Sequence, residues 1–243
     1  SGHVRIYSSN LNNQTQNLSE NTTAVTTYSV TDADAGDTVS WSLSGADAGL
    51  FDIDSATGVL TFKSAPDYET PLGGVNDNSN AYQITIIATD SDSNTDTTNL
   101  TVNVADVNDN DPVLNVDATS TVSAVENSTT VATYSVTDAD AGDTVSYSIS
   151  GNDAGLFDID SDGVLTFKSS PDYETPGSGA SSNAYSVTLT ATDSASNTDT
   201  TDVTINVGDV NEAPVLNVDA TSTVSADENS IIVAAYSVTD ADA

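Results

Sequence analysis

Apolar and polar residues alternate along much of the chain with a period of two. Val145, Tyr147 and Ile149 alternate with serines, and apolar residues occupy every second position through 185–191 and again through 203–207. This period is typical of a β-strand with one buried face, and no stretch shows sustained helical spacing. The pattern therefore predicts an all-β protein.

Turn signals separate the predicted strands. Residues 155–159 and 163–167 flank a tight turn at 161–163, which predicts a β-hairpin. With 112–122 counted as an edge strand, about seven strands fall within a stretch the size of one domain. Short strands with Gly, Asn and Asp at their turns favour an antiparallel seven-stranded Greek-key, immunoglobulin-like β-sandwich.

The strand pattern recurs about every hundred residues, which is the length of an independently folding domain and too long for a solenoid repeat. A Glu-Asn pair stands at 20–21, 126–127 and 228–229, and the segment 28–40 is identical to 134–146. We therefore expect tandem domains within a longer protein. The expected parts are an N-terminal segment with the first edge strand at 1–17, repeats at 18–111 and 112–213, and the truncated start of a third repeat at 214–243.

Charge limits the partners that the chain can have. It contains 37 acidic residues and 3 Lys or Arg, and its net charge at pH 7 is −34. Nucleic-acid binding needs clustered basic residues and is excluded, whereas cations are natural partners. His3 is the only histidine and cysteine is absent, which argues against Zn²⁺ and Cu²⁺. Because the acids gather at domain ends where no concave pocket is predicted, we do not expect an enzyme. The sequence also lacks an apolar run long enough for a membrane span.

Two local features have ordinary structural explanations. Trp41 occupies the place that Tyr147 takes in the next copy and alternates with apolar residues, so we expect it in the core. The acidic segment 158–163 imitates the start of an EF-hand loop, but the twelfth position, where a bidentate Glu should stand, is Ser169. We therefore interpret this segment as a hairpin turn.

The segment DVNDNDP at 106–112 has a composition suited to a hard cation. Its Asp and Asn residues lie where one copy ends and the next begins. Like charges this close repel one another unless a cation lies among them. Ca²⁺ prefers six to eight oxygen ligands from carboxylates, amides, backbone carbonyls and water, which are the groups that this segment offers.

With these motifs the chain resembles the cadherin repeat from about residue 18 onward. Its repeats are similar to the cadherin-like repeats of large bacterial surface and secreted proteins. The motifs that carry the resemblance are Glu-Asn near the start of each copy, Asp-x-Glu at 67–69 and 172–174, Ala-x-Asp at 88–90 and 191–193, the linker at 106–112, and Asp-x-Asp at 138–140. The family match implies Ca²⁺ between successive repeats, about three ions for each complete junction.

The resemblance also implies a set of metal ligands. For the first junction these are Glu20, Asp67 and Glu69, then Asp106, Asn108 and Asp109 with the backbone carbonyls of Val107 and Asn110, then Asp138, Asp140 and Asp193. For the second junction they are Glu126, Asp172, Glu174, Asp209, Asn211, Glu212, Asp240 and Asp242. Glu212 and Ala213 replace the family's Asp and Asn, so we expect altered geometry there. Asp32, Asp34 and Asp90 form half a site that either awaits an upstream partner or is solvated.

The leading hypothesis for function is a calcium-rigidified spacer or adhesion module of a large bacterial extracellular or cell-surface protein. A carbohydrate-binding module is the alternative, with Tyr68 and Tyr173 as its only recurrent aromatic candidates. Homophilic adhesion is a third hypothesis, although no Trp precedes Trp41 to support strand exchange of the animal type. The expected partners are calcium and neighbouring repeats, with cell-surface or polysaccharide ligands and other copies of the chain as further candidates.

Overall fold

The computed structural model describes residues 5–7, 14–32, 36–73, 79–218, 223–231 and 236–242. Asp34, part of the half-site expected from the sequence, lies outside these residues. The chain divides into two compact units: the first comprises residues 1–109 with 139–142, and the second comprises 110–138 with 143–243. Among the described residues, no helix has the length and apolar character needed to cross a membrane.

The strands follow the period-two pattern of the sequence. Those that begin in the first unit are β1 (Arg5–Tyr7), β2 (Gln14–Ser19), β3 (Ala24–Thr27), β4 (Ser29–Thr31), β5 (Ser40–Ser44), β6 (Phe51–Ile53), β7 (Val59–Phe62), β8 (Ala81–Thr89) and β9 (Thr95–Ala105), with a 3-10 helix η1 (Ala48–Leu50) before β6. Those of the second are β10 (Val113–Leu114), β11 (Thr119–Val125), β12 (Thr130–Thr133), β13 (Val136–Thr137), β14 (Ser146–Ser150), β15 (Phe157–Ile159), β16 (Val164–Phe167), β17 (Ala184–Thr192), β18 (Thr198–Gly208), β19 (Val215–Leu216) and β20 (Val238–Thr239), with η2 (Ala154–Leu156) before β15.

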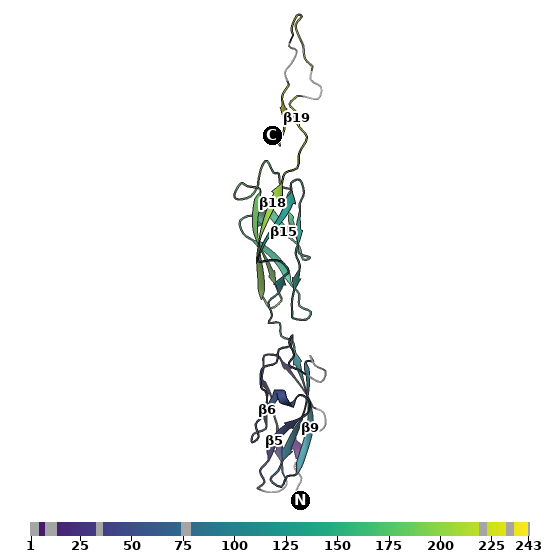
Figure 1. The fold of residues 1–243 in the computed structure, drawn as a ribbon, viewed down its shortest axis with the longest axis vertical. Helices are drawn as coiled ribbons and strands as arrows, with labels where there is room; N and C mark the ends of the chain where they lie inside the picture. The colour runs from purple at the N-terminus through teal and green to yellow at the C-terminus, as the bar shows by residue number, and fades with distance from the viewer. Residues whose placement is uncertain are drawn as a thin grey trace. The chain divides into compact units, whose positions relative to one another are not determined.

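Each unit is built as two facing sheets (Figure 1). In the first unit a four-stranded sheet in the order β2-β9-β8-β5 faces a three-stranded sheet in the order β3-β7-β6. The second unit repeats this arrangement with β11-β18-β17-β14 and β12-β16-β15. The predicted all-β, immunoglobulin-like sandwich is therefore confirmed.

Two details of strand pairing differ from the sequence-based expectation. The β2–β9 and β11–β18 pairs are parallel, whereas the other ladders are antiparallel, because the first long strand of each repeat runs in the same direction as its last. The edge strand expected at 112–122 forms two strands, since the chain bends between them: β10 pairs with β13 and β11 pairs with β18.

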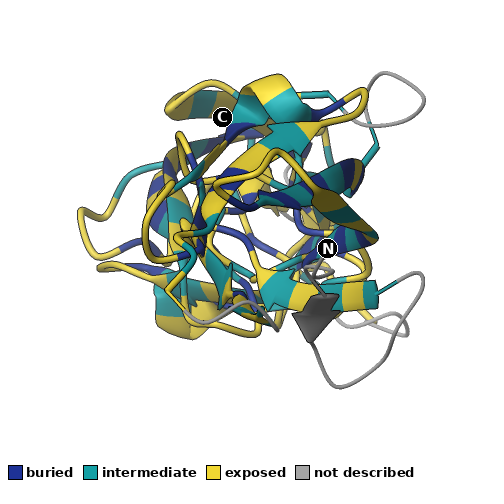
Figure 2. Cartoon of the chain, turned by 90° about the horizontal axis from the view of Figure 1, so that it is seen from below, coloured by how far each residue is buried: buried dark blue, intermediate teal, exposed yellow. Residues whose placement is uncertain are grey.

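The core of each unit lies between its two sheets, and Figure 2 shows buried residues in dark blue alternating with exposed ones in yellow along the strands. Trp41 is 6% exposed, which confirms its predicted place in the core. Phe51 and Phe62 stack at a ring-centroid distance of 4.2 Å, and Tyr82 meets both rings edge-on. The second unit repeats this aromatic group with its own three counterparts.

The acidic segment 158–163 is a hairpin turn, as predicted. It joins β15 to β16, whose residues pair in antiparallel register. Asp160 Oδ1 accepts hydrogen bonds from the backbone N of Asp162 (3.0 Å) and of Val164 (2.9 Å), so this carboxylate closes the turn.

Candidate metal centre

Glu20 joins two separate loops at one end of the first unit. The chain turns sharply after β2, and Asn21 adopts φ 60°, a left-handed conformation that Asn tolerates better than most residues. Glu20 is 3% exposed, and its two carboxylate oxygens accept hydrogen bonds from the backbone N of Val107 (2.8 Å) and of Tyr68 (2.6 Å). The Glu-Asn motif therefore ties the start of the linker to the Asp-x-Glu loop.

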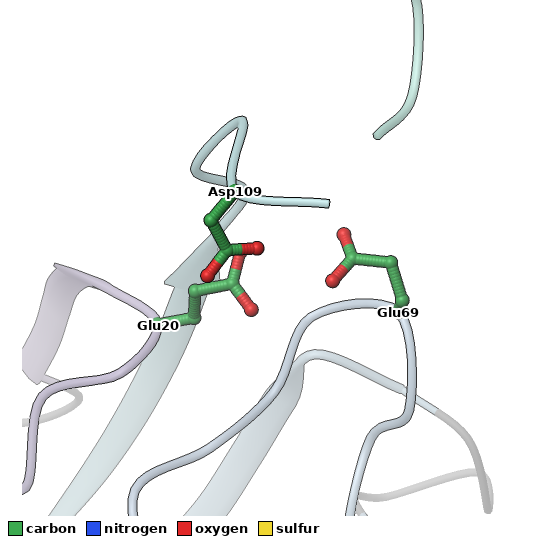
Figure 3. Close-up of side chains that lie close together, drawn as sticks. All are labelled: Glu20, Glu69 and Asp109. Atoms are coloured by element: carbon green, nitrogen blue, oxygen red, sulfur yellow. The ribbon is translucent and has the colours of Figure 1, made fainter. Parts of the chain in front are cut away.

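Two overlapping acidic groups form at this end, each with carboxylate oxygens within 4.8 Å of one another. The first contains Glu20, Glu69 and Asp109, and the second contains Glu69, Asp106 and Asp140. In Figure 3 the carboxylates of Glu20 and Asp109 lie together, and Glu69 extends toward them from another loop. The structure thus brings together five of the acids proposed from the sequence.

Asp106 has one satisfied and one unsatisfied oxygen. Its Oδ2 accepts a hydrogen bond from the backbone N of Ala141 (3.2 Å). Its Oδ1 is buried and has no hydrogen-bond partner among the described residues. A buried carboxylate oxygen without a donor is costly, and a cation would remove that cost.

The other residues proposed at this end make local contacts. Asp67 is exposed, and its Oδ1 accepts a hydrogen bond from the backbone N of Thr70 (2.8 Å). The backbone O of Asn110 accepts one from Asn197 Nδ2 (3.4 Å). Asn108 is half-buried. Val107, expected to contribute its carbonyl, contacts Glu20 through its backbone N–H.

A further acidic group lies at the start of the second unit and includes a residue that the sequence analysis missed. Asp138, Asp143 and Asp193 have carboxylate oxygens within 4.8 Å of one another. Asp193 is 6% exposed and accepts hydrogen bonds from both the backbone N and the side-chain Nδ2 of Asn197, each at 2.7 Å. Asp143 accepts hydrogen bonds from the backbone N and the hydroxyl of Ser194.

The first unit repeats this group as Asp32, Asp37 and Asp90. Hydrogen bonds from Asn94, chiefly from its side chain, lower the pKa of Asp90 and keep it ionised. The signal that could have revealed Asp37 and Asp143 was present in the sequence, since both end the repeated segment DADAGD.

The far end of the second unit reproduces the geometry of Glu20. Glu126 is 3% exposed and accepts hydrogen bonds from the backbone N of Val210 (2.6 Å) and of Tyr173 (2.8 Å). Glu126, Glu174 and Asp209 form an acidic group with oxygens within 4.8 Å. Asp172, like Asp67, accepts a hydrogen bond inside its own loop, from the backbone N of Thr175 (2.8 Å).

Asp242 brings the start of the third copy to this second acidic group. Its Oδ2 accepts hydrogen bonds from the backbone N of Glu212 (2.8 Å) and from Asn211 Nδ2 (2.7 Å), and its own backbone N donates to Asp240 Oδ1 (3.2 Å). Glu212 Oε1 accepts a hydrogen bond from Asn127 Nδ2 (2.8 Å). The longer Glu212 therefore keeps the contact that Asp109 makes with the Asn of the first Glu-Asn pair.

Burial and neighbouring carboxylates at this end shift the pKa values of several carboxyl groups. Burial, followed by the charges of nearby carboxylates, raises the pKa values of Glu174 and Asp209. Burial also raises the pKa of Glu212. Burial opposes ionisation of Asp242 as well, but the hydrogen bonds that it accepts outweigh this effect and lower its pKa. Without a cation, the group thus resists carrying its full negative charge.

The donor set fits a calcium ion. All the side-chain ligands offer oxygen, and Ca²⁺ takes carboxylate and carbonyl oxygens in flexible geometry. Like Asp106 Oδ1, the atoms Glu212 Oε2 and Asp242 Oδ1 are buried without a hydrogen-bond partner in the part of the chain that the structure describes. At both ends a bound cation would compensate these buried oxygens.

The fold and these sites define a class: tandem immunoglobulin-like sandwiches with acidic groups at their ends. The family model for the cadherin domain matches residues 14–105 and 120–208. The chain therefore belongs to the cadherin domain family. Such repeats typically bind Ca²⁺, occur in extracellular ectodomains, and serve as non-enzymatic adhesion or spacer modules.

Three of the similar proteins are protocadherins. Mouse Protocadherin Fat 4 is 33% identical over 141 residues, which cover 55% of this chain and 3% of that protein. The structure of human Protocadherin-24 EC1-2 has a TM-score of 0.66 at 23% identity and covers 86% of this chain and 98% of that one. The Protocadherin gammaB7 EC3-6 cis-dimer structure has a TM-score of 0.63 at 27% identity, covering 99% of this chain and 61% of that one.

Proposed function

We propose that this chain is a calcium-rigidified spacer or adhesion segment of a large extracellular protein, in which Ca²⁺ at the junctions holds successive repeats in a rod. The proposed repeats run from 18 to 111 and from 112 to 213, followed by the start of a third. We propose a bacterial surface or secreted protein because the repeat sequences resemble the cadherin-like repeats of such proteins.

The observation that carries this proposal is the paired arrangement of Glu20 and Glu126. In each copy a buried Glu fixes the start of the linker against the Asp-x-Glu loop, and further carboxylates lie within 4.8 Å of it. Close carboxylates repel one another, and a divalent ion between them turns that repulsion into attraction. The ion would then add to the hydrogen bonds by which Glu20 and Glu126 connect the linker with the Asp-x-Glu loop.

The residues at the first junction would bind about three ions, the number that the resemblance to the cadherin repeat implies. Glu20, Glu69 and Asp109 would contribute to one site, and Asp106 and Asp140 would extend it. Asp138 and Asp193 would contribute from the second repeat. At the second junction Glu212 replaces the linker Asp, and we propose that it binds with altered geometry.

Small-angle X-ray scattering of the intact chain tests this function. With calcium at millimolar concentration we expect a single long maximum dimension, and with EDTA a broader distribution of distances. Asp109→Ala should give the EDTA profile even in calcium, whereas Asp96→Ala, which removes one charge from a strand outside the acidic groups, should behave as wild type. Identical scattering with calcium and with EDTA would rule the proposal out.

A further inference from the structure

The outward face of the four-stranded sheet in the first unit contains a recess of about 360 Å³. Its side chains come from neighbouring strands, with Gln83 and Thr85 on β8 and Asn99 and Thr101 on β9. Gln83 is paired with Thr101, and Thr85 with Asn99, across the antiparallel ladder. Paired positions lie side by side on the same face of a sheet, so the four polar groups form one compact set.

Contacts beneath the recess hold its wall in place. The buried carboxylate of Asp47 accepts a hydrogen bond from the backbone N of Gln83 (2.6 Å), and the backbone N of Asp47 donates to the Gln83 carbonyl (3.4 Å). Gly45 stands at the rim with φ +108°, and a Cβ there would lie 3.2 Å from Ile84 Cα. The turn after β5 can therefore approach β8 this closely only with glycine.

Some hydrogen-bonding groups of the recess bond to each other, and others are available to a ligand. Thr85 Oγ1 donates to Asn99 Oδ1 (2.9 Å), which leaves the Asn99 amide Nδ2 as a donor. Gln83 lies on the exposed face of β8, where its side-chain amide can both donate and accept. Two amides and two hydroxyls side by side suit a ligand that itself carries several hydroxyl groups.

Charge narrows the class of ligand. None of the described residues that line the recess is charged, although the chain carries 37 acidic residues. A cation finds no carboxylate among the lining residues, since the Asp47 carboxylate beneath them is buried and bonded to Gln83 N, and an anion finds no positive group while the net charge of −34 repels it. We propose that this recess binds a neutral sugar unit of a glycan. Its volume lies in the range of small-molecule sites and would hold one or two sugar rings.

The equivalent sheet face of the second unit carries different side chains. Ser186 stands where Gln83 does, and Asp202 stands where Asn99 does, with Thr188 Oγ1 donating to Asp202 Oδ1 (2.8 Å). Both amide donors are thus replaced, one of them by a carboxylate. The first unit should therefore bind the sugar and the second should not.

The recess is distinct from the aromatic sugar platform considered from the sequence. Tyr68 and Tyr173, the recurrent tyrosines, are partly buried against the two cores, and neither of them lines this recess. With hydrogen bonds and no aromatic stacking, we expect weak binding, with a Kd on the order of 1 mM.

Nuclear magnetic resonance titration of the ¹⁵N-labelled intact chain tests the proposal. The probes are cellohexaose, maltohexaose and laminarihexaose, each added to several millimolar. At least one of them should shift the amide signals of Gln83, Thr85, Asn99 and Thr101. If none of the three shifts these signals, the proposal is wrong.

Two variants and a matched control make the test specific. Gln83→Ala and Asn99→Asp should each weaken binding by about tenfold or more, whereas Ser186→Ala in the second unit should leave it unchanged. Asn99→Asp keeps the shape of the side chain and copies the residue that the second unit already has, so folding should be preserved. Unchanged affinity in both variants would overturn the assignment. Sugar binding should be the same in calcium and in EDTA. The sugar-binding proposal can therefore be confirmed or refuted independently of the proposed calcium function.

Discussion

Replacing Glu20 by Gln should destabilise the first unit to an extent that depends on salt. The buried Glu20 carboxylate accepts hydrogen bonds from the backbone N of Tyr68 (2.6 Å) and of Val107 (2.8 Å). Glutamine keeps the shape of the side chain, but its NH₂ group would face one of these N–H donors. Losing one charge-assisted hydrogen bond in this way costs about 2 kcal/mol of folding free energy.

The same substitution removes one of three neighbouring negative charges. Glu20, Glu69 and Asp109 have carboxylate oxygens within 4.8 Å of one another. Because Glu20 is buried, the repulsion at this separation is at least the value of about 0.9 kcal/mol that two unit charges have in a dielectric like that of water. In metal-free protein at low salt, the relief from two neighbours therefore offsets the lost hydrogen bond. At an ionic strength of 1 M the Debye length falls to about 3 Å, which screens the exposed Asp109 most, so more of the hydrogen-bond loss remains.

Thermal unfolding followed by Trp41 fluorescence measures this effect, because Trp41 is the only Trp of the chain and is buried in the first unit. In EDTA, the midpoint of Glu20→Gln relative to wild type should fall between low salt and 1 M choline chloride, by at most roughly 8 °C. Glu126→Gln removes the equivalent contacts in the second unit and should leave the Trp41 transition unchanged. A midpoint difference between Glu20→Gln and wild type that is the same at low salt and in 1 M salt would refute the reasoning.

The remaining predictions concern calcium, pH and one glycine. The raised pKa values of Glu174 and Asp209 mean that, without metal, these groups favour the folded state below their unfolded pKa and lose that contribution as pH rises through the folded pKa. Calcium binds the ionised carboxylates, so calorimetry from pH 7 to pH 5 should show affinity falling faster at this end than at the first; equal losses would contradict this. Glu212→Asp should tighten calcium binding at the second junction in the same titration, and unchanged affinity would show that side-chain length there is irrelevant. Gly58→Ala should cost more than about 2 kcal/mol in urea unfolding, because Gly58 has φ +71° and a Cβ would lie 2.6 Å from the Tyr28 carbonyl O; a cost below about 0.5 kcal/mol would contradict it.

Local patterns in the sequence were sufficient to predict the fold. The alternation around Tyr147 and through 185–191 depends only on which face of a strand is buried, and the structure has strands β14 and β17 there. The turn at 161–163 was predictable because its residues close it through contacts with near neighbours. Trp41 was assigned to the core by the same alternation.

Contacts between distant segments could not be predicted in this way. The role of Glu20 as a hydrogen-bond acceptor for two loops depends on residues 48 and 87 positions away. The division of 112–122 into β10 and β11 depends on which sheet each half joins. Asp143 was missed because its proximity to Asp138 and Asp193 follows from the path of the loop after β13, whereas the sequence motif drew attention only to the Asp-x-Asp pair.

The two Glu-centred ends should differ in calcium affinity because they differ in what an ion must disrupt. At both ends the central Glu is already held by two backbone N–H groups, and each of its oxygens keeps a second lone pair for a metal. That part of the geometry exists before an ion binds, so the difference comes from the other carboxylates. At the second end Asp242 is hydrogen-bonded to Asn211 and to the backbone N of Glu212, and burial, followed by the charge of Asp242, raises the pKa of Asp209. An ion there has to replace these contacts and bind carboxylates whose ionised form is disfavoured. The weaker site is therefore expected at the second end, because its acids are already partly engaged with one another.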